Sequence, residues 1–395
     1  MRIAMRMGLH SEAALAKLPP FEIEMRRRLW WALALFDARI GELADYKNMG
    51  LSPLWDCKPP LNVNDSELWP GMKELPTAPS QAKPSEALFA ASHACLMDVI
   101  RRSSFYLDFS GPAFKGLADK VSLSELEAMM ESKFLKTCDT ENPDHCMAMW
   151  TCRTKLARYQ LMEHYSKQGG LGPSQTDAQR DTALDYAFSY LENDTKMVGC
   201  TRLRRYDWYH FMFFPLPGYI HVIFDLRMRP LSAHSTRAWD VLGANYDARF
   251  RLVKDADNPR FRSLANLILM AWDARVMATA RDSGSGTQSK LPPPTPPPIV
   301  SAIHAARSSS LSGWTEDGNV AQQEHRAAAV APAGSDLSAS TAAGGDLDWG
   351  PVEFADTLQY GMDWQADLSA SLGVPADANL TQLNWAAMGW DLEER

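Results

Sequence analysis

The sequence has no long uninterrupted hydrophobic run. Its longest apolar stretch, Phe211 to Phe224, is broken by Pro215 and Pro217 and falls short of the ~18 residues that a membrane-spanning helix needs. The first fifteen residues lack the unbroken apolar segment and the small-residue cleavage site of a secretion signal. We therefore expect no membrane span and no export, and we expect an intracellular protein.

Cysteine is sparse, and its spacing is poor for metal binding. The chain has six cysteines in 395 residues, and no two of them stand three positions apart, whereas zinc sites typically use C-x2-C pairs. Cys138, Cys146 and Cys152 surround His145, which makes a metal site an alternative on residue types alone. The spacing favours ordinary buried thiols of a reducing compartment, so we predict no metal site.

Short catalytic and nucleotide-binding motifs are missing as well. The sequence contains no GxGxxG, P-loop, HExxH or GxSxG pattern. A helical protein can hold an active site without such a signature, but no residue here can be nominated for catalysis. We predict that the chain is not an enzyme and that it binds no cofactor of its own.

Most of the chain also lacks a surplus of positive charge. The net charge of -8 comes from residues 346–395, with ten acids and one base, because residues 1–280 hold 35 bases and 33 acids. Nucleic-acid interfaces usually present clustered bases, so we predict no direct DNA contact. Two short basic clusters, Arg26–Arg28 and Arg202–Arg205, favour solvated flanks that pair with carboxylates, with a nuclear import signal as the alternative.

Helical periodicity dominates residues 1–280. A stripe of apolar residues steps by three or four after Pro19 and Pro20, which predicts a long helix with one buried face. The stripe consists of Met25, Leu29, Leu33, Phe36, Ile40 and Leu43. Ser122 to Glu125 has the form of a capping box, and the buried residues predicted to follow it are Leu126, Met129, Met130 and Phe134.

Further helices are predicted from the same periodicity. They cover residues 85–106, 146–167, 178–192, 233–251 and 261–280. Alternating β patterns are scarce, so the sequence predicts an all-α body over residues 1–280.

The composition changes sharply near residue 280. Residues 281–345 are rich in Pro, Ser, Ala and Gly and include six prolines between Pro292 and Pro298. With so little apolar surface to bury, this segment is expected to be a disordered linker. Its proline patch favours a plain spacer over a docking site for an SH3-like or WW-like module.

Residues 346–395 alternate acids with large apolar groups, which is typical of amphipathic activation segments. We predict that this segment contacts a transcriptional coactivator. The aromatic residues predicted to make the contact are Trp349, Phe354, Trp364, Trp385 and Trp390. The alternative is an amphipathic segment that folds back onto the helical body.

Two blocks near the N-terminus resemble a known family. They read E-M-R-R-R-L-W-W over Glu24–Trp31 and P-L-N-V-N-D over Pro60–Asp65. Together they resemble the fungal-specific transcription factor domain, the middle homology region of fungal zinc binuclear-cluster regulators. The motif residues to which the resemblance gives a structural role are Arg26, Arg27, Arg28, Trp30, Trp31, Asp37, Asn62, Asn64 and Asp65. The resemblance is strong over residues 1–70 and weaker to about 165.

The resemblance implies the helical regulatory body of a nuclear transcription regulator. In that family a separate N-terminal cluster of six cysteines holds two zinc ions and reads DNA. This chain has no C-x2-C-x6-C cluster, so we expect it to begin within the domain, and we expect zinc only if such a cluster precedes it.

Expected partners are a transcriptional coactivator or another regulator. The residues leave open a small-molecule effector and a homodimer or heterodimer. One alternative is a small-molecule-sensing helical module, in which the aromatic segment 206–224 forms a pocket wall and the tail covers it. The other alternative is an inactive truncated regulator with no activation function.

Overall fold

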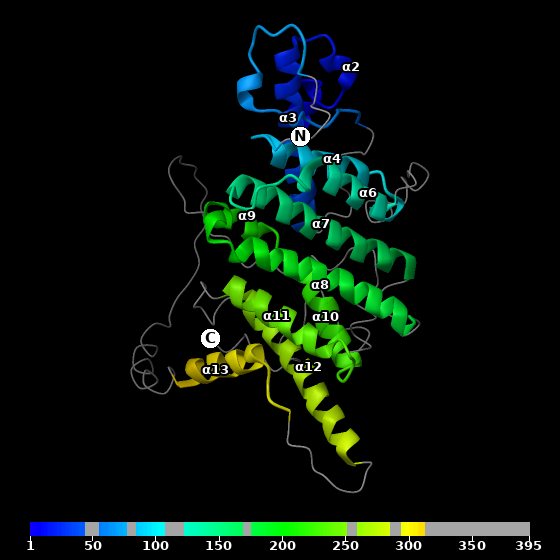
Figure 1. Cartoon of the computed structure of the whole chain (residues 1–395), viewed down its shortest axis with the longest axis vertical. Coiled ribbons are helices and arrows are strands. Elements are labelled where there is room, and N and C mark those ends of the chain that lie inside the picture. The colour runs from blue at the N-terminus through cyan, green and yellow to red at the C-terminus, as the bar shows by residue number, and fades with distance from the viewer. Residues whose placement is uncertain are drawn as a thin grey trace, which may run out of the picture.

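The computed structural model describes residues 1–43, 55–76, 84–106, 122–168, 175–250, 259–284 and 294–312. Within these ranges the regular structure is helical and contains no strand, which confirms the predicted all-α class (Figure 1). None of the described helices is long and apolar enough to cross a membrane.

The helices divide along the chain into two groups. The first group is α1 (Arg2–Arg6), α2 (Glu12–Leu15), α3 (Pro20–Leu43), η1 (Asp65–Glu67), α4 (Leu88–Ile100), α6 (Leu123–Met130), η3 (Glu131–Leu135) and α7 (Pro143–Gln168). The second group is α8 (Asp177–Gly199), η4 (Thr201–Tyr206), α9 (Asp207–Met212), α10 (Leu216–Met228), α11 (Ser235–Phe250), α12 (Pro259–Gly284) and α13 (Pro298–Ser312).

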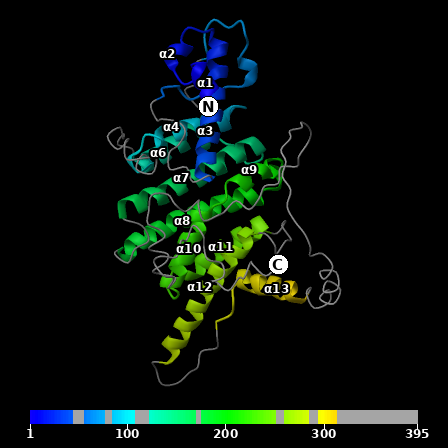
Figure 2. The same cartoon turned by 180° about the vertical axis from the view of Figure 1, so that it is seen from behind.

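The helices are stacked along the long axis of the molecule. The short helices α1 and α2 form a lobe at one end with the first half of α3, whose second half runs down beside α4. The long helices α7 and α8 follow side by side, then α10, α11 and α12, with α13 to one side of α11 and α12 (Figures 1 and 2). In this stacked arrangement, the second half of α3 lies close to the middle of the molecule.

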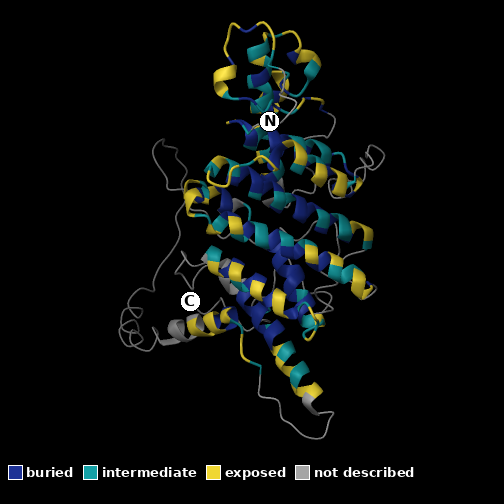
Figure 3. Cartoon of the chain, viewed as in Figure 1, coloured by how far each residue is buried: buried dark blue, intermediate teal, exposed yellow. Residues whose placement is uncertain are grey.

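The α7 helix takes part in two hydrophobic cores. Its residues Met149, Cys152 and Leu156 belong to the core that α1, α3, α4 and α6 share. Leu161 and Tyr165 belong to the second core, with α8 and α10 to α13. Figure 3 shows the buried residues concentrated in the middle of the stack, with exposed residues at α1, at η1 and on α13.

The predicted buried stripe of α3 is wrong. Its exposed members include Leu29, Phe36 and Ile40, whose residue exposures are 49%, 49% and 51%. The buried residues are instead Trp30 and Trp31, at 0% and 1%. Consecutive helix positions differ by about 100°, and two adjacent indoles bury more apolar surface than the leucines beside them. The helix therefore turns its tryptophans inward.

The linker prediction is wrong for residues 298–312, which form α13. The apolar residues Ile299, Val300 and Ile303 are 1%, 0% and 0% exposed, in the core that contains α11 and α12. Pro298 occupies the first position of the helix, where proline is well tolerated. Three apolar residues on one face are enough to pack this helix, although the surrounding composition is that of a linker.

The other predicted helices are present with different ends. The helix predicted over 85–106 is shorter, as α4, whereas those predicted over 146–167, 178–192 and 261–280 are longer, as α7, α8 and α12. The helix predicted over 233–251 is α11. As predicted, Ser122 caps α6, because its Oγ accepts a hydrogen bond from the Glu125 N–H at 3.3 Å.

Candidate functional site

Most of the motif residues meet where α3 contacts the segment that contains residues 55–65, an arrangement we call the α3 joint. Its outer part is held by the carboxylate of Glu12. Arg27 Nε donates to Glu12 Oε1 at 2.9 Å, and the Lys58 N–H donates to the same oxygen at 2.8 Å. Burial raises the pKa of Glu12, but Arg27 and the Lys58 N–H outweigh it and leave the pKa lowered. One ionised side chain thus connects three segments.

A second carboxylate, Glu24, lies fully buried in the joint. Its Oε1 accepts from the Leu61 N–H at 3.0 Å and from Arg28 Nε at 3.3 Å. Arg28 also donates through Nη1 to Asp65 Oδ1 at 2.6 Å. Burial raises the pKa of Glu24, and the two hydrogen bonds offset it only in part.

The motif tryptophans pack around Trp55. The centroids of Trp30 and Trp31 lie 5.4 and 4.8 Å from that of Trp55, in edge-to-face geometry. Trp31 Nε1 also donates to the Lys58 carbonyl at 2.9 Å. Aromatic pairs in this geometry contribute beyond the area they bury, so the indoles fix the segment against α3.

The asparagines of the second motif block fasten the segment to the start of α4. Asn62 Oδ1 accepts from Ser85 Oγ at 2.7 Å, and Asn64 Oδ1 accepts from the Glu86 N–H at 3.2 Å. In return, the Asp65 N–H donates to Glu86 Oε2 at 2.9 Å. The P-L-N-V-N-D block therefore bridges α3 and α4.

Two motif residues lie outside the joint. Arg26 pairs only loosely with Glu22 at 3.6 Å, and both are partly exposed. Asp37 lies further along α3, where burial raises its pKa and the charge of the N-terminal amine opposes the rise. The structure therefore does not bring these two together with the other seven.

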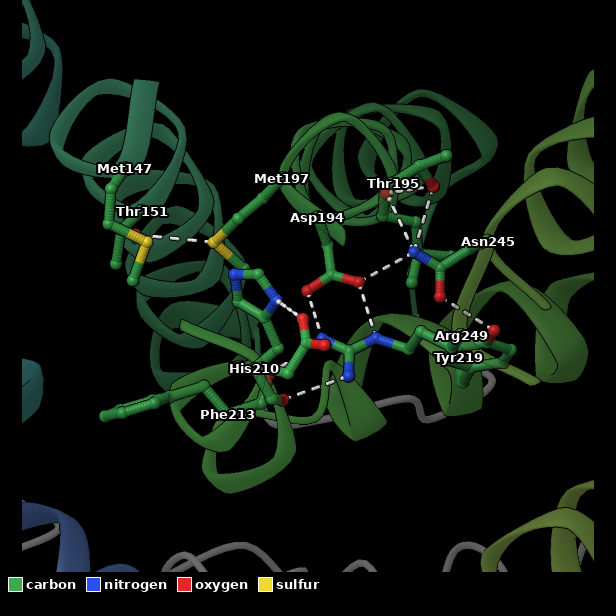
Figure 4. Close-up of polar contacts among 12 residues, drawn as sticks. Met147, Thr151, Asp194, Thr195, Met197, His210, Phe213, Tyr219, Asn245 and Arg249 are labelled. Carbon is green, nitrogen blue, oxygen red and sulfur yellow. Dashed lines mark hydrogen bonds and ion pairs between the residues drawn. The ribbon is translucent and has the colours of Figure 1, made fainter. Parts of the chain in front are cut away.

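A second polar arrangement, the α8–α11 network, lies deep in the stack (Figure 4). Its centre is Asp194, which is 0% exposed, paired with Arg249, whose side chain is 7% exposed. Arg249 Nε donates to Asp194 Oδ2 at 2.7 Å, and its Nη2 donates to the other carboxylate oxygen. Burial lowers the pKa of Arg249, but the Asp194 charge and hydrogen bonds outweigh it and leave the pKa raised. Arg249 therefore keeps its positive charge in the folded protein.

The network extends through Asn245. Its Nδ2 donates to Asp194 Oδ2 at 2.8 Å and to Thr195 Oγ1 at 2.9 Å, while its Oδ1 accepts from the Tyr219 hydroxyl at 2.8 Å. Arg249 donates further, to the carbonyls of His210 and Phe213 at 3.1 Å each. The network therefore joins α8, α10 and α11 and also holds the end of α9.

A small cavity lies beside the network. Its walls come from the second half of α3, from α7 and α8, and from the segment between α9 and α10. Its volume is about 30 Å³, enough for about two water molecules. The aromatic segment 206–224, predicted as a pocket wall under the sensing alternative, contributes Tyr209, Phe213, Phe214, Leu216 and Pro217. The tail that this alternative places over the pocket lies outside the described residues.

Curated proteins with similar sequences are fungal regulators. Transcriptional regulator AacuB from Aspergillus aculeatus is 42% identical over 305 residues, covering 76% of this chain and 40% of that protein. Transcriptional regulator nsrM from Aspergillus novofumigatus is 34% identical over 416 residues, covering 99% and 53%. Aurofusarin cluster transcription factor aurR2 from Gibberella zeae is 29% identical over 338 residues, covering 80% and 47%.

The chain is a homologue of fungal transcriptional regulators. It spans about half, or less, of the length of these relatives. No protein-family model matches it, and no solved structure does. The names of its relatives are those of regulators and not of enzymes.

Two of the three cysteines around His145 in this regulator homologue contact backbone carbonyls. Cys146 Sγ donates to the Thr140 carbonyl at 3.0 Å and Cys138 Sγ to the Phe134 carbonyl at 3.4 Å, while His145 Nδ1 accepts from the Asp139 N–H at 3.1 Å. Burial raises the pKa of Cys138 to about 11. Among the described residues, no three His, Cys, Asp or Glu side chains form a group that could hold a metal ion.

The second basic cluster pairs with the turn before α7, in line with the predicted flank. Arg202 Nη1 donates to the Thr140 carbonyl at 3.1 Å, and Arg205 Nη2 donates to Asp144 Oδ1 at 2.6 Å. The aromatic residues predicted to contact a coactivator lie outside the described residues. They are Trp349, Phe354, Trp364, Trp385 and Trp390.

Proposed function

We propose that the chain is the regulatory region of a fungal transcription regulator of the fungal-specific transcription factor type, and that it controls one pathway. The observation that carries the proposal is the similarity to transcriptional regulator nsrM, which extends over 99% of this chain at 34% identity. Two other relatives are named as transcription factors of a cluster, one of them a biosynthesis cluster. At the level of the pathway, the protein is proposed to control the genes of a single biosynthetic cluster.

In this proposal the helical body acts in the nucleus through protein contacts. Residues 1–280 hold 35 bases and 33 acids, which supports a role other than binding the DNA backbone. The proposed partners are a coactivator and a second regulator, as a homodimer or heterodimer. The proposed regulator binds zinc only if a cysteine cluster lies outside this sequence.

The segment proposed to activate transcription is the acidic-aromatic tail, residues 346–395. Its aromatic side chains insert into an apolar groove of a coactivator, and its ten acids speed the encounter with a basic rim around that groove. The composition supports this mechanism, because the charges keep exposed aromatics soluble until a partner covers them.

A reporter assay tests the proposal on the full chain fused to a foreign DNA-binding domain. We expect activation, and we expect its loss when Trp349, Phe354, Trp364, Trp385 and Trp390 are all replaced by alanine. The matched control is Q359A/Q365A/Q382A, which changes polar residues of the same tail and should keep activation. Immunoblots confirm equal amounts of each fusion.

The outcomes separate the candidates. Activation that survives the loss of all five aromatics contradicts the tail mechanism. A full-chain fusion that never activates contradicts an activation function and favours the sensing alternative, for which the cavity beside the α8–α11 network is the supporting observation.

A further inference from the structure

We propose that the cavity between α3, α7 and the segment joining α9 to α10 binds the carboxylate group of a short organic acid. The inference is independent of the transcriptional proposal, because it requires only the folded chain and a binding measurement. It rests on the charge of the cavity wall, on one buried hydroxyl and on the size of the space.

Three cationic side chains contribute to the wall. Arg39 comes from α3, and Lys155 and Arg158 come from α7. The Arg39 guanidinium carbon lies 4.8 Å and the Lys155 ammonium 5.2 Å from the centroid of Phe213, another wall residue. Both cations are therefore held over one ring at the cavity. A carboxylate placed there meets positive charge from two helices in a partly desolvated site, where Coulomb attraction is stronger than in water.

A buried hydroxyl in the same wall points to a hydrogen-bonding ligand. Thr154 is 7% exposed, and its Oγ1 has no hydrogen-bond partner among the described residues. A threonine within a helix usually satisfies its hydroxyl on a carbonyl one turn earlier, and leaving it unsatisfied is costly. A carboxylate oxygen in the cavity accepts this hydrogen bond and removes the cost.

The size of the space limits the ligand. A volume of about 30 Å³, room for about two waters, matches a carboxylate group and excludes an aromatic ring. The apolar part of the wall, which includes Met197 and Leu216, suits a methyl group or short alkyl chain next to the carboxylate. A short aliphatic acid therefore matches the cavity in charge, hydrogen bonding and volume.

Binding at this position would link distant parts of the fold. Arg39 lies in the second half of α3, whose first half forms the α3 joint, whereas Lys155 and Thr154 lie in the middle of α7. A carboxylate shared by these groups ties α3 to α7. The ligand should therefore stabilise the whole chain against unfolding and not only the cavity.

Thermal unfolding of the full chain tests the proposal, with acetate as the probe at constant ionic strength set by chloride. Millimolar concentrations are needed because so small a ligand binds weakly. We expect the midpoint to rise with acetate concentration and to stay constant with acetamide, the uncharged molecule of nearly the same shape. An unchanged midpoint in acetate, or an equal rise in acetamide, would overturn the proposal.

Two variants and one control locate the effect. Thr154→Val should keep or raise the midpoint without ligand, because no protein hydrogen bond is lost, and should weaken acetate binding about tenfold. Lys155→Gln should abolish the acetate-dependent rise, whereas Lys167→Gln, an exposed change on the same helix, should not alter it. If Thr154→Val and Lys155→Gln bind acetate like the unchanged chain, acetate acts elsewhere and the assignment is wrong.

Discussion

The α3 joint and the α8–α11 network hold the molecule together in different ways. In the joint, several charged and polar side chains bridge short segments, and most of them come from two recognisable sequence blocks. In the network, one ion pair links Asp194, which is 0% exposed, to Arg249, whose side chain is 7% exposed and which lies 55 positions further along the chain, and no sequence motif marks the pair. Recognisable motif blocks therefore identify the joint, including its buried carboxylate Glu24, whereas the buried ion pair of the network has no local sequence signal.

The physical difference is the cost of losing one partner. At the joint, water can replace part of a lost contact, because the side chains of Arg27 and Glu12 are 11% and 19% exposed. In the network, removing one charge leaves the other buried without compensation, which is strongly destabilising. The first two predictions below measure this difference, and the third measures the effect of burying a titratable group in the hydrophobic core.

The largest effect is expected from Asp194→Ala. It leaves the Arg249 guanidinium buried without its carboxylate, so the free energy of unfolding should fall by about 3–5 kcal/mol in urea titrations. The control Asp185→Ala removes an exposed carboxylate on the same helix, 3.4 Å from Arg237, and should change little. An Asp194→Ala chain as stable as this control would contradict the central role of the ion pair.

Breaking the joint should lower the free energy of unfolding by less than Asp194→Ala does. Glu12→Ala removes the acceptor of Arg27 and of the Lys58 N–H, and we expect a loss of about 1–3 kcal/mol at neutral pH. The pKa of Glu12 is lowered on folding, so its contribution is present above the unfolded pKa of 4.5 and disappears as the pH falls below the folded value. The difference between the unchanged and variant chains should therefore narrow in acid.

The matched control for the joint is Glu22→Ala, which removes the more exposed and more distant partner of Arg26. Its free energy of unfolding should be close to that of the unchanged chain. If Glu12→Ala were as costly as Asp194→Ala, the proposed difference between joint and network would be wrong.

The third effect is a gradual loss of stability with falling pH that comes from the buried core. His221 is 3% exposed and its Nδ1 lies 2.6 Å from the Tyr165 hydroxyl; burial lowers its pKa from 6.5 to about 3. Below pH 6.5 the unfolded chain binds a proton that the folded chain does not. Stability should therefore fall by about 1.4 kcal/mol per pH unit from this group until the folded pKa is reached.

The variant His221→Gln removes this titration and keeps a hydrogen-bonding side chain. Urea titrations between pH 6.5 and 4.5 should show a shallower loss of stability than in the unchanged chain. The exposed Ser301 on α13 provides the control, since Ser301→Ala changes no titratable group and should leave the slope unchanged. Equal slopes for His221→Gln and the unchanged chain would show that His221 is protonated in the folded state.

Periodicity predicted the all-α class and the main helices because each of them buries a repeating apolar face. It failed where tertiary contacts overrule local pattern. The predicted end of α8 at residue 192 stops before a polar run, but Asp194 in that run is buried by its pairing with Arg249. On α3 the periodic apolar stripe contains more residues than the tryptophan pair. The tryptophans are nevertheless the buried residues, because Trp55 provides a packing partner for their indoles.

The candidate sites show the same limit. The motif blocks named seven residues of the α3 joint, but the role of Glu12 as its carboxylate depends on a fold-back that spacing does not reveal. The sensing alternative expected the segment 206–224 to form a pocket wall because of its aromatic content. The cationic side of the same cavity comes from Arg39 on α3 and from Lys155 and Arg158 on α7, far from that segment in sequence, and only the folded chain brings these surfaces together.

The α7 helix has a consequence for how this chain unfolds. Because it supplies side chains to both hydrophobic cores, unfolding of α7 itself exposes both cores to water. We therefore expect the joint and the network to be coupled through this one helix. A destabilising change at either end should raise amide exchange along α7, and cleavage within residues 143–168 should disturb both cores.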